Sequence, residues 1–482
     1  MSHTTIAEAP PTVEEGWSGQ RVAVIIILIA MISAGGMLLS VGSQAIPSVQ
    51  KEFNTSLGFL SPTLLLLSGA IFNPIFGRLA DIHGKRRIIV IGVVIGAVGA
   101  VISALAPDYE IFLVGRVVQG ALTAVIFIPT ALVRETFPSR IVPSAIGIVL
   151  TGAGLPGAFL PFVTGWLLDS YGVTVLFLAI GGYALVTALV VRVFLQETTV
   201  RATGRLDILG SFLLGFALAA ILAGVSLSST LGWGSPLIFG LLAIGVVFAI
   251  AWVVTARRIK QPLIDVRVIA RRSVWSSLIV GGLSAAVSAA FLITASIVSQ
   301  TPSKIGLGYG LSLNASGFAI LEGGLLFGLL VGGFIAGQLV RKLGEFPLLG
   351  LTLTVGVAAS LLTLLAINSL PVFALLSFVI GLVSGIMFAT LLNLLLRIVP
   401  DERKGSTSTV WGTTVSVFQS LIPVVAISLA AAIAPGIAGG LSKGGVDVLF
   451  VACAICFAAA IVVLLLARPG RAEGSPTEIP AL

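Results

Sequence analysis

The sequence predicts an all-α, polytopic membrane protein. Of its 482 residues, 57% are hydrophobic and only 10% are charged, and the mean hydropathy is +1.14. Because soluble domains carry about 25% charged residues, a soluble fold of this composition would leave a large apolar surface in water. The 56 glycines fit helices that pack closely against one another in lipid.

Fourteen apolar runs are long enough to cross a bilayer, since a helix needs about 20 apolar residues to span ~30 Å of hydrocarbon. The first six runs are 22–46, 57–79, 88–106, 109–133, 144–168 and 173–195. The remaining runs are 208–227, 236–256, 274–298, 313–340, 347–367, 371–396, 407–433 and 447–467. The polar residues before the first run lack the features of a secretory signal, so this run is expected to remain as a span.

Basic residues are distributed very unequally between the two sides of these spans. With both termini in the cytoplasm, 23 of the 27 Lys and Arg residues lie inside, Lys51, Lys304 and Lys443 lie outside, and Arg116 lies within a span. Because positive charge near short loops resists translocation, this orientation is predicted, in the cell membrane. The net charge of +8 therefore indicates topology and contacts with anionic lipids on the cytoplasmic face, and it argues against nucleic-acid binding.

A repeated motif predicts two related halves. Residues 77–84, GRLADIHG, and residues 337–344, GQLVRKLG, share the spacing G-x-L-x-x-x-x-G. Pro138 and Pro161 are matched by Pro400 and Pro423 at an offset of 262 residues. Parallel repeats of this kind are a transporter architecture. The expected fold is two pseudo-symmetric six-helix bundles plus two inserted helices.

The predicted domains follow from these runs. They are a cytoplasmic tail (1–20), an N-terminal bundle (21–195), a linker with two extra transmembrane helices (196–273), a C-terminal bundle (274–467) and a second cytoplasmic tail (468–482).

The first copy of the motif is either a conformational gate or only a tight turn. Gly77 permits close helix approach, and Gly84 permits a positive φ. Asp81 can cap a helix N-terminus or pair with an arginine. Lys85 and Arg86 beside it are expected to extend to the membrane interface. A capped, ion-paired contact at a moving seam would hold one conformation and release it later.

These residues resemble the major facilitator superfamily, whose loop between helices two and three reads G-x-L-A-D-R-x-G-R-K. The matching residues here are Gly77, Leu79, Ala80, Asp81, Gly84, Lys85 and Arg86, with Ile82 in place of the usual arginine. The segment GRVVQG (115–120) is similar to the family's R-x-x-Q-G pattern, with Arg116, Gln119 and Gly120. This resemblance implies alternating access by rocking of the two bundles.

Fourteen spans, together with QPLIDVRVIARR (261–272), resemble the fourteen-helix drug:proton antiporter branch of that superfamily. The resemblance implies multidrug efflux. The branch's antiporter signature, G-x-x-x-G-P-x-x-G-G, is kept at Gly157, Pro161 and Gly165, but Leu160 and Thr164 fill two glycine places. On the first span Leu38 falls where the branch has an acid. An export role fits these departures, whereas the usual proton site is not evident.

Two ionisable residues inside the spans are candidates for proton coupling or for the substrate cavity. An isolated Arg116 within lipid is costly, so it either faces a cavity or is tied to backbone carbonyls. Glu322 lies deep in the tenth span and is either a proton-exchange site or a wet acid near the outer mouth. A carboxyl buried away from water favours its neutral form, which is what a coupling site needs. We expect Arg116 and Glu322 to interact directly or across the cavity in one state.

Other polar residues have less specific expectations. Asp169 and Glu135 are expected to cap helices or form pairs. The following residues face either substrate or neighbouring helices: Gln44, Asn73, Gln119, Asn314, Asn393 and Gln419. With few fixed charges the pocket is expected to be apolar, which favours lipophilic substrates.

The favoured function is proton-coupled export of hydrophobic or amphiphilic compounds by a functional monomer. The alternatives are a uniporter or a lipid or metabolite carrier without proton coupling, a membrane enzyme, and a channel. We expect no cofactor, no metal and no catalytic residue. Cys453 and Cys456 lack further ligands for a metal, and the sequence has no G-x-x-x-x-G-K-[ST] motif for ATP.

Overall fold

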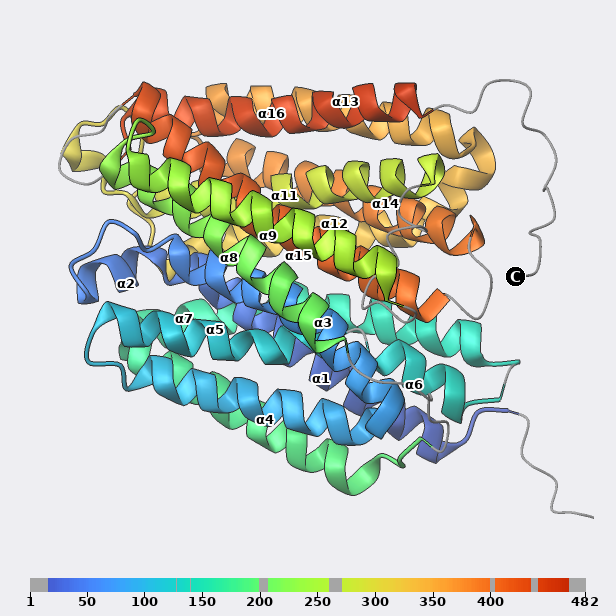
Figure 1. Ribbon diagram of the computed structural model, residues 1–482. Coiled ribbons are helices and arrows are strands. Elements are labelled where there is room, and N and C mark those ends of the chain that lie inside the picture. The colour runs from blue at the N-terminus through green and yellow to red at the C-terminus, as the bar shows by residue number, and fades with distance from the viewer. Residues whose placement is uncertain are drawn as a thin grey trace, which may run out of the picture.

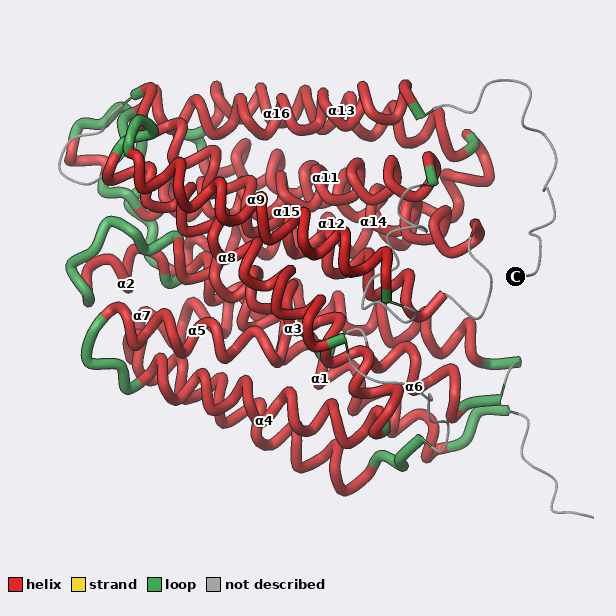
Figure 2. The backbone as a smooth tube through the Cα atoms, in the orientation of Figure 1, coloured by secondary structure: helices red, strands yellow, loops and turns green. Residues whose placement is uncertain are grey.

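The computed structural model describes residues 16–126, 128–138, 140–198, 207–259, 271–398, 404–434 and 441–467. Within these ranges all regular elements are helical, and loops lie at the two ends of the helices (Figure 2). Several parts of the sequence predictions lie outside the described residues, namely the segments 1–15, 260–270 and 468–482, Pro400, and three of the arginines counted on the inner side, Arg201, Arg205 and Arg403.

The first six predicted spans correspond to a continuous set of helices. These are α1 (Gly19–Gln44), α3 (Leu60–His83), α4 (Lys85–Ala104), α5 (Tyr109–Ala124) with α6 (Ile128–Thr136), and α7 (Val142–Phe194). The 53 residues of α7 would extend ~80 Å as one helix at 1.5 Å per residue. Gly172, at φ +79°, interrupts α7 and separates the two predicted spans. A short helix, α2 (Ile46–Glu52), follows α1.

The predicted span 109–133 corresponds to the apolar helical run Tyr109–Thr136, which is long enough to cross a membrane and consists of α5 followed by α6. The chain leaves the helix after Ala124, and α6 begins at Ile128, followed by Pro129. Proline lacks a backbone N–H and disfavours helical geometry in the residue before it, so it suits a new helix start rather than a helix interior.

The second part of the chain contains the remaining spans. They are α8 (Ile208–Leu231), α9 (Pro236–Arg258), α11 (Arg272–Gln300), α12 (Ala315–Leu343), α13 (Glu345–Ala366), α14 (Leu370–Ile398), α15 (Lys404–Ile433) and α16 (Lys443–Leu466). A 3₁₀ turn, η1 (Ser303–Ile305), lies between α11 and α12. Among the described residues, 13 helical runs are long and apolar enough to cross a membrane, and the break at Gly172 divides one of them into two spans. The chain is thus a multi-pass helical membrane protein.

Two separate cores organise these helices into two halves. Leu28, Phe112 and Phe177 belong to a core built from α1 to α7. Phe291, Phe373 and Phe450 pack edge to face in a core built from α11 to α16, with ring centroids 5.8–6.2 Å apart. In Figure 1 the blue and cyan helices of the first half lie below the orange and red helices of the second.

The inserted helices differ from each other in burial. Leu222 of α8 packs with Leu67 of α3 and Val424 of α15, so α8 lies where the two halves meet. By contrast, α9 is mostly exposed, with Phe239 at 62% and Ile250 at 59%. A helix that is apolar on its exposed side fits contact with lipid.

The two copies of the sequence motif adopt the same local structure. Gly84 at φ +104° joins α3 to α4, and Gly344 at φ +81° joins α12 to α13. These positive φ values favour glycine at both turns. We call the end of the molecule with these turns the basic end. The opposite end carries α2, which Figure 1 shows on the far side of the helices from α6.

Candidate functional site

The two halves are hydrogen-bonded to each other towards the opposite end of the molecule. Ser296 Oγ of α11 donates to the carbonyl of Ser43 in α1 at 2.7 Å. Gln300 Nε2, one turn later, donates to the carbonyl of Gln44 at 3.3 Å. Towards this end, α1 and α7 of the first half contact α11 and α12 of the second half. We call this contact the seam.

Asp169 of α7 extends this seam to the start of α12. Its carboxylate accepts hydrogen bonds from the backbone N–H groups of Ala315 at 2.9 Å and Ser316 at 2.8 Å, and from Ser316 Oγ at 2.5 Å. A carboxylate is favoured at a helix N-terminus, where N–H groups have no partner within the helix. Asp169 therefore caps a helix, as the sequence predicts, but the helix belongs to the other half.

Gly165 lies one turn before Asp169 on α7 and makes this approach possible. A Cβ atom at Gly165 would lie 2.9 Å from the carbonyl carbon and oxygen of Ala315. Any larger residue would therefore push α12 away. Of the antiporter-like residues, Gly165 thus lies in the seam, Pro161 lies inside α7, and a Cβ at Gly157 would meet nothing within 4 Å.

Glu322 of α12 is buried in the same interface and is only 1% exposed. The side chains of Ser40 and Gln44 on α1 lie against its carboxyl group. Oε2 of Glu322 and Oγ of Ser40 have no hydrogen-bond partner among the described residues. The structure therefore shows a buried acid between the two halves and not a wet acid at an outer mouth.

The Gln44 side chain makes two hydrogen bonds to α7. Its Nε2 donates to the carbonyl of Pro161 at 2.8 Å, and its Oε1 accepts from Thr164 Oγ1 at 2.8 Å. Gln44 therefore joins α1 to α7 and lies beside Glu322 of α12. Thr164, which replaces a glycine of the family signature, makes this bond possible.

Arg116 of α5 is fully buried and is held by neighbouring oxygen atoms. Its guanidinium donates to the carbonyls of Ser61 at 3.4 Å and Leu38 at 3.3 Å, and to Gln119 Oε1 at 2.5 Å. It also lies 5.3 Å from the centre of the Phe177 ring. Of the two alternatives for Arg116, the geometry shows the arginine tied to backbone carbonyls.

The described residues contain no direct ion pair between Arg116 and Glu322. Helix α1 is the element that contacts both, since Arg116 binds the Leu38 carbonyl and Glu322 lies against Ser40 and Gln44. A direct contact between the two residues in another state remains a prediction.

The turn at Gly84 is stabilised by a buried lysine. Lys85 is 2% exposed and forms ion pairs with Glu135 at 2.5 Å and Asp81 at 3.5 Å. The expectation that Lys85 extends to the membrane interface is therefore wrong for this residue, because its side chain is buried and its ammonium group pairs with two carboxylates. Glu135 pairs as expected, whereas Leu79 and Gly77 are only partly buried.

The N-terminus of α4 is capped by a residue that the sequence did not indicate. Glu197 accepts from the backbone N–H groups of Arg86 and Arg87, both at 3.0 Å, and Thr198 Oγ1 accepts from that of Lys85 at 3.3 Å. Asp81 was expected either to cap a helix or to pair with an arginine; it pairs with Lys85 at 3.5 Å, and Glu197 caps α4. Arg86 also donates to the Leu195 carbonyl at 3.0 Å.

Three of the remaining polar candidates form hydrogen bonds within the protein. Gln119 Nε2 donates to Ser103 Oγ at 3.1 Å, Asn314 caps α12 through the Gly317 N–H at 2.9 Å, and Asn393 Nδ2 donates to the Ala389 carbonyl at 2.8 Å. Asn73 is buried and Gln419 partly buried. Substrate contacts for these residues remain predictions.

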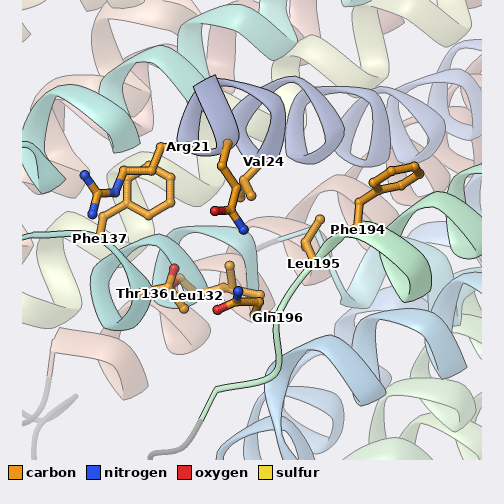
Figure 3. A pocket seen from close by; sticks show the side chains of 9 residues that line it. Arg21, Val24, Leu132, Thr136, Phe137, Phe194, Leu195 and Gln196 are labelled. Carbon is orange, nitrogen blue, oxygen red and sulfur yellow. The ribbon is translucent and has the colours of Figure 1, made fainter. Parts of the chain in front are cut away.

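A pocket of about 150 Å³ lies at the basic end within the first half (Figure 3). Arg21 of α1, Phe137 after α6, and Phe194 and Gln196 at the end of α7 are among its lining residues. Glu322 does not line it, so this pocket is separate from the seam. The described residues contain no group of three His, Cys, Asp or Glu side chains suited to a metal ion.

These features define a helical membrane protein with two halves that meet around a buried polar seam. The sequence model of the family described as the Major Facilitator Superfamily matches residues 24–207 and 201–423 of this chain. The chain belongs to that superfamily and is a transporter.

Similar proteins have several named activities. A "Uridine/deoxyuridine transporter" of Lactococcus lactis subsp. cremoris (strain MG1363) is 24% identical over 388 residues, covering 79% of this chain and 80% of that protein. A "Multidrug resistance protein B homolog" of Mycobacterium tuberculosis (strain CDC 1551 / Oshkosh) is 32% identical over 251 residues, covering 49% of this chain and 44% of that protein.

Solved structures show the same fold at low sequence identity. An auto-inhibited POT family peptide transporter has a TM-score of 0.63 and 16% identity, covering 95% of this chain and 99% of that chain. A bacterial homologue of the human lysosomal transporter Spinster, inward-facing and unoccupied, has a TM-score of 0.59 and 15% identity, covering 94% of this chain and 96% of that chain.

Proposed function

We propose that this chain is a proton-driven exporter of hydrophobic or amphiphilic small molecules, of the fourteen-helix drug:proton antiporter type. The observation that carries the proposal is Glu322, a carboxyl group buried between the two halves. It has no Lys, Arg or His ion-pair partner among the described residues. The multidrug-resistance relative supports the substrate class.

The proton acts through the burial of Glu322. An uncompensated carboxylate costs several kcal/mol when it is removed from water, and the neutral acid avoids this cost. Protonation therefore stabilises the conformation in which the seam is closed around Glu322. Loss of the proton favours opening of the seam, which lets water reach the carboxylate.

The orientation of the protein in the membrane determines whether the link between Glu322 protonation and seam opening drives export. We place the basic end in the cytoplasm, because of the positive charge near its loops. In this proposal the closed seam blocks access from the outside, and the proton-loaded form admits substrate from the cytoplasm. Substrate binding from that side favours release of the proton, and the deprotonated, substrate-loaded carrier opens outward. A cysteine at exposed Arg87 tests the orientation, since labelling by an impermeant reagent on intact cells would contradict it.

The second candidate is a metabolite carrier without proton coupling. The uridine/deoxyuridine transporter, which matches 79% of the chain, favours it, and so does Leu38 in the place of the first-span acid. Anionic lipids at the basic end and a functional monomer are compatible with both proposals.

Transport by cells expressing wild-type protein or Glu322→Gln distinguishes the two candidates. A panel of lipophilic cationic, neutral and anionic dyes is compared with radiolabelled uridine. The exporter predicts lower dye accumulation in wild-type cells, and loss of this difference with Glu322→Gln. Uridine uptake that is unchanged by Glu322→Gln, without any dye efflux, would support the carrier instead.

A further inference from the structure

The pocket of Figure 3 lies at the basic end, where α1, the end of α6 and the end of α7 meet. Arg21 is its charged lining residue. Its uncharged polar lining residues are Gln20, Thr136 and Gln196. In Figure 3, Arg21 lies at one end of the pocket and Phe194 lies at the other. With no carboxylate among its described lining residues, the pocket suits an anionic group that is attached to an apolar one.

The pocket has room for such a group. Its volume is about 150 Å³, whereas a single water molecule needs only ~10–15 Å³ of comparable space. Leu132, Phe137 and Leu195 line the pocket and belong to the core of the first half. The pocket is therefore a preformed space whose apolar walls are held in place by that core.

The Arg21 side chain can bind an anion while it keeps its contact inside the protein. Its Nη1 donates to the carbonyl of Gly16, and a guanidinium has five N–H donors. The planar guanidinium also matches the geometry of a phosphate group, to which it can donate two parallel hydrogen bonds. Arg21 therefore suits recognition of a phosphate group.

The charges around the pocket also favour an anion. Arg134 of α6 and Arg192 of α7 are exposed at the same end of the molecule. Of the nearby acids, Glu135 is paired with Lys85, and Glu197 accepts hydrogen bonds from the first N–H groups of α4. The described surroundings of the pocket are therefore net positive.

The outer surface of α7 connects the pocket to the lipid. Val186, Leu189 and Val193 follow one another at a spacing of three and four residues and are 60–62% exposed, so they form one apolar stripe on the helix. The stripe leads to Phe194, which lines the pocket and is itself 63% exposed. Trp17, just before α1, is also exposed, as is common at the headgroup level of a membrane. A ligand in the pocket can thus place an acyl chain on the stripe and a phosphate at the depth of the headgroups.

We propose that the pocket binds the headgroup of an anionic phospholipid in the leaflet at the basic end. The Arg21 guanidinium binds the phosphate, and an acyl chain lies along the apolar stripe of α7. The amides of Gln20 and Gln196 donate to the remaining headgroup oxygens. Because the lining residues come from α1, α6 and α7, a bound lipid holds these three helices together. This binding does not involve Glu322 and is independent of the proton coupling proposed above.

Native mass spectrometry of the full-length protein in detergent measures this binding, with phosphatidylglycerol and phosphatidylcholine of identical acyl chains as the probes. The first phosphatidylglycerol is expected to bind about fivefold more tightly than the first phosphatidylcholine, which is the preference that one basic residue near a membrane surface supplies. Equal binding of the two lipids would overturn the proposal. Excess inorganic phosphate should leave the preference unchanged, because it cannot occupy the stripe. Displacement of phosphatidylglycerol by phosphate would overturn the assignment to a lipid.

Three variants separate the pocket from the general charge of the basic end. Arg21→Gln removes the guanidinium, and Gln196→Glu places a negative charge in the lining at an exposed position, so each is expected to reduce the preference to less than about twofold. Arg341→Gln, at an exposed arginine in the last turn of α12, is the matched control and should keep the full preference.

A full preference in both Arg21→Gln and Gln196→Glu, or an equal loss in Arg341→Gln, would overturn the pocket as the binding site. If Arg21→Gln fails to fold, Gln196→Glu decides alone, because its side chain is exposed.

Discussion

Replacing Asp169 by alanine should shift the protein from its closed-seam conformation towards an open one. The carboxylate accepts three hydrogen bonds from Ala315 and Ser316 across the seam. Loss of a capping side chain costs about 0.5–2 kcal/mol, and the charge–helix interaction contributes about 0.3–1 kcal/mol. Because Asp169 is exposed, we take about 1 kcal/mol, which is roughly a fivefold change in the closed-to-open ratio.

Helix α12 should remain intact in this variant. Asn314 still caps the Gly317 N–H, so the lost energy belongs mainly to the contact between halves. Asp108→Ala is the matched control, because Asp108 caps α5 through the Ile111 N–H at 2.8 Å without contacting the other half.

The assay is the distance distribution between spin labels at Lys51 and Lys304, measured at one pH in detergent and in nanodiscs. Asp169→Ala should increase the open fraction about fivefold relative to the parent, and Asp108→Ala should leave it within a factor of two. An Asp169→Ala distribution identical to the parent, with folding preserved, would refute the idea that this cap holds the seam closed.

Three further substitutions test other contacts. Lys85→Met removes both ion pairs of this lysine but leaves carboxylates that water can reach, so thermal unfolding should show a loss of about 1 kcal/mol; an unchanged midpoint would mean that the ion pairs are not stabilising. Gly165→Val places atoms where Ala315 packs, so accessibility of a cysteine at Ser316 to a water-soluble maleimide should rise several-fold, and equal labelling would contradict this packing. Glu197→Gln weakens the cap of α4 by about 1 kcal/mol, which should appear as faster amide hydrogen exchange in its first turn, whereas wild-type exchange would show that another group supplies the cap.

Much of the fold could be predicted because lipid imposes a simple rule on sequence. Each span must be a long apolar helix, so the run boundaries are visible from composition. Gly84 and Gly344 could be assigned to turns because positive φ favours glycine. The break between Ala124 and Ile128 was not predicted, since an apolar run looks the same whether it holds one helix or two.

The candidate site could be predicted only in part, because its contacts join residues far apart in sequence. Glu322 was evident as a deep carboxylate, but its neighbours on α1 depend on how the halves meet. The cap of α4 comes from Glu197, more than a hundred residues away, and no local motif marks it. Lys85 belongs to a basic cluster of the kind that usually faces solvent, and its burial is favourable because Glu135, fifty residues away, joins Asp81 in pairing with it.

Substrate-evoked proton movement is the most direct test of proton coupling at Glu322. Proteoliposomes that contain a trapped pH indicator are given a transported lipophilic dye without an initial pH gradient. The account predicts that dye movement drives protons in the opposite direction with wild-type protein, and that Glu322→Gln abolishes this proton signal. Equal proton movement with Glu322→Gln, or dye movement by wild-type protein without any proton signal, would contradict it.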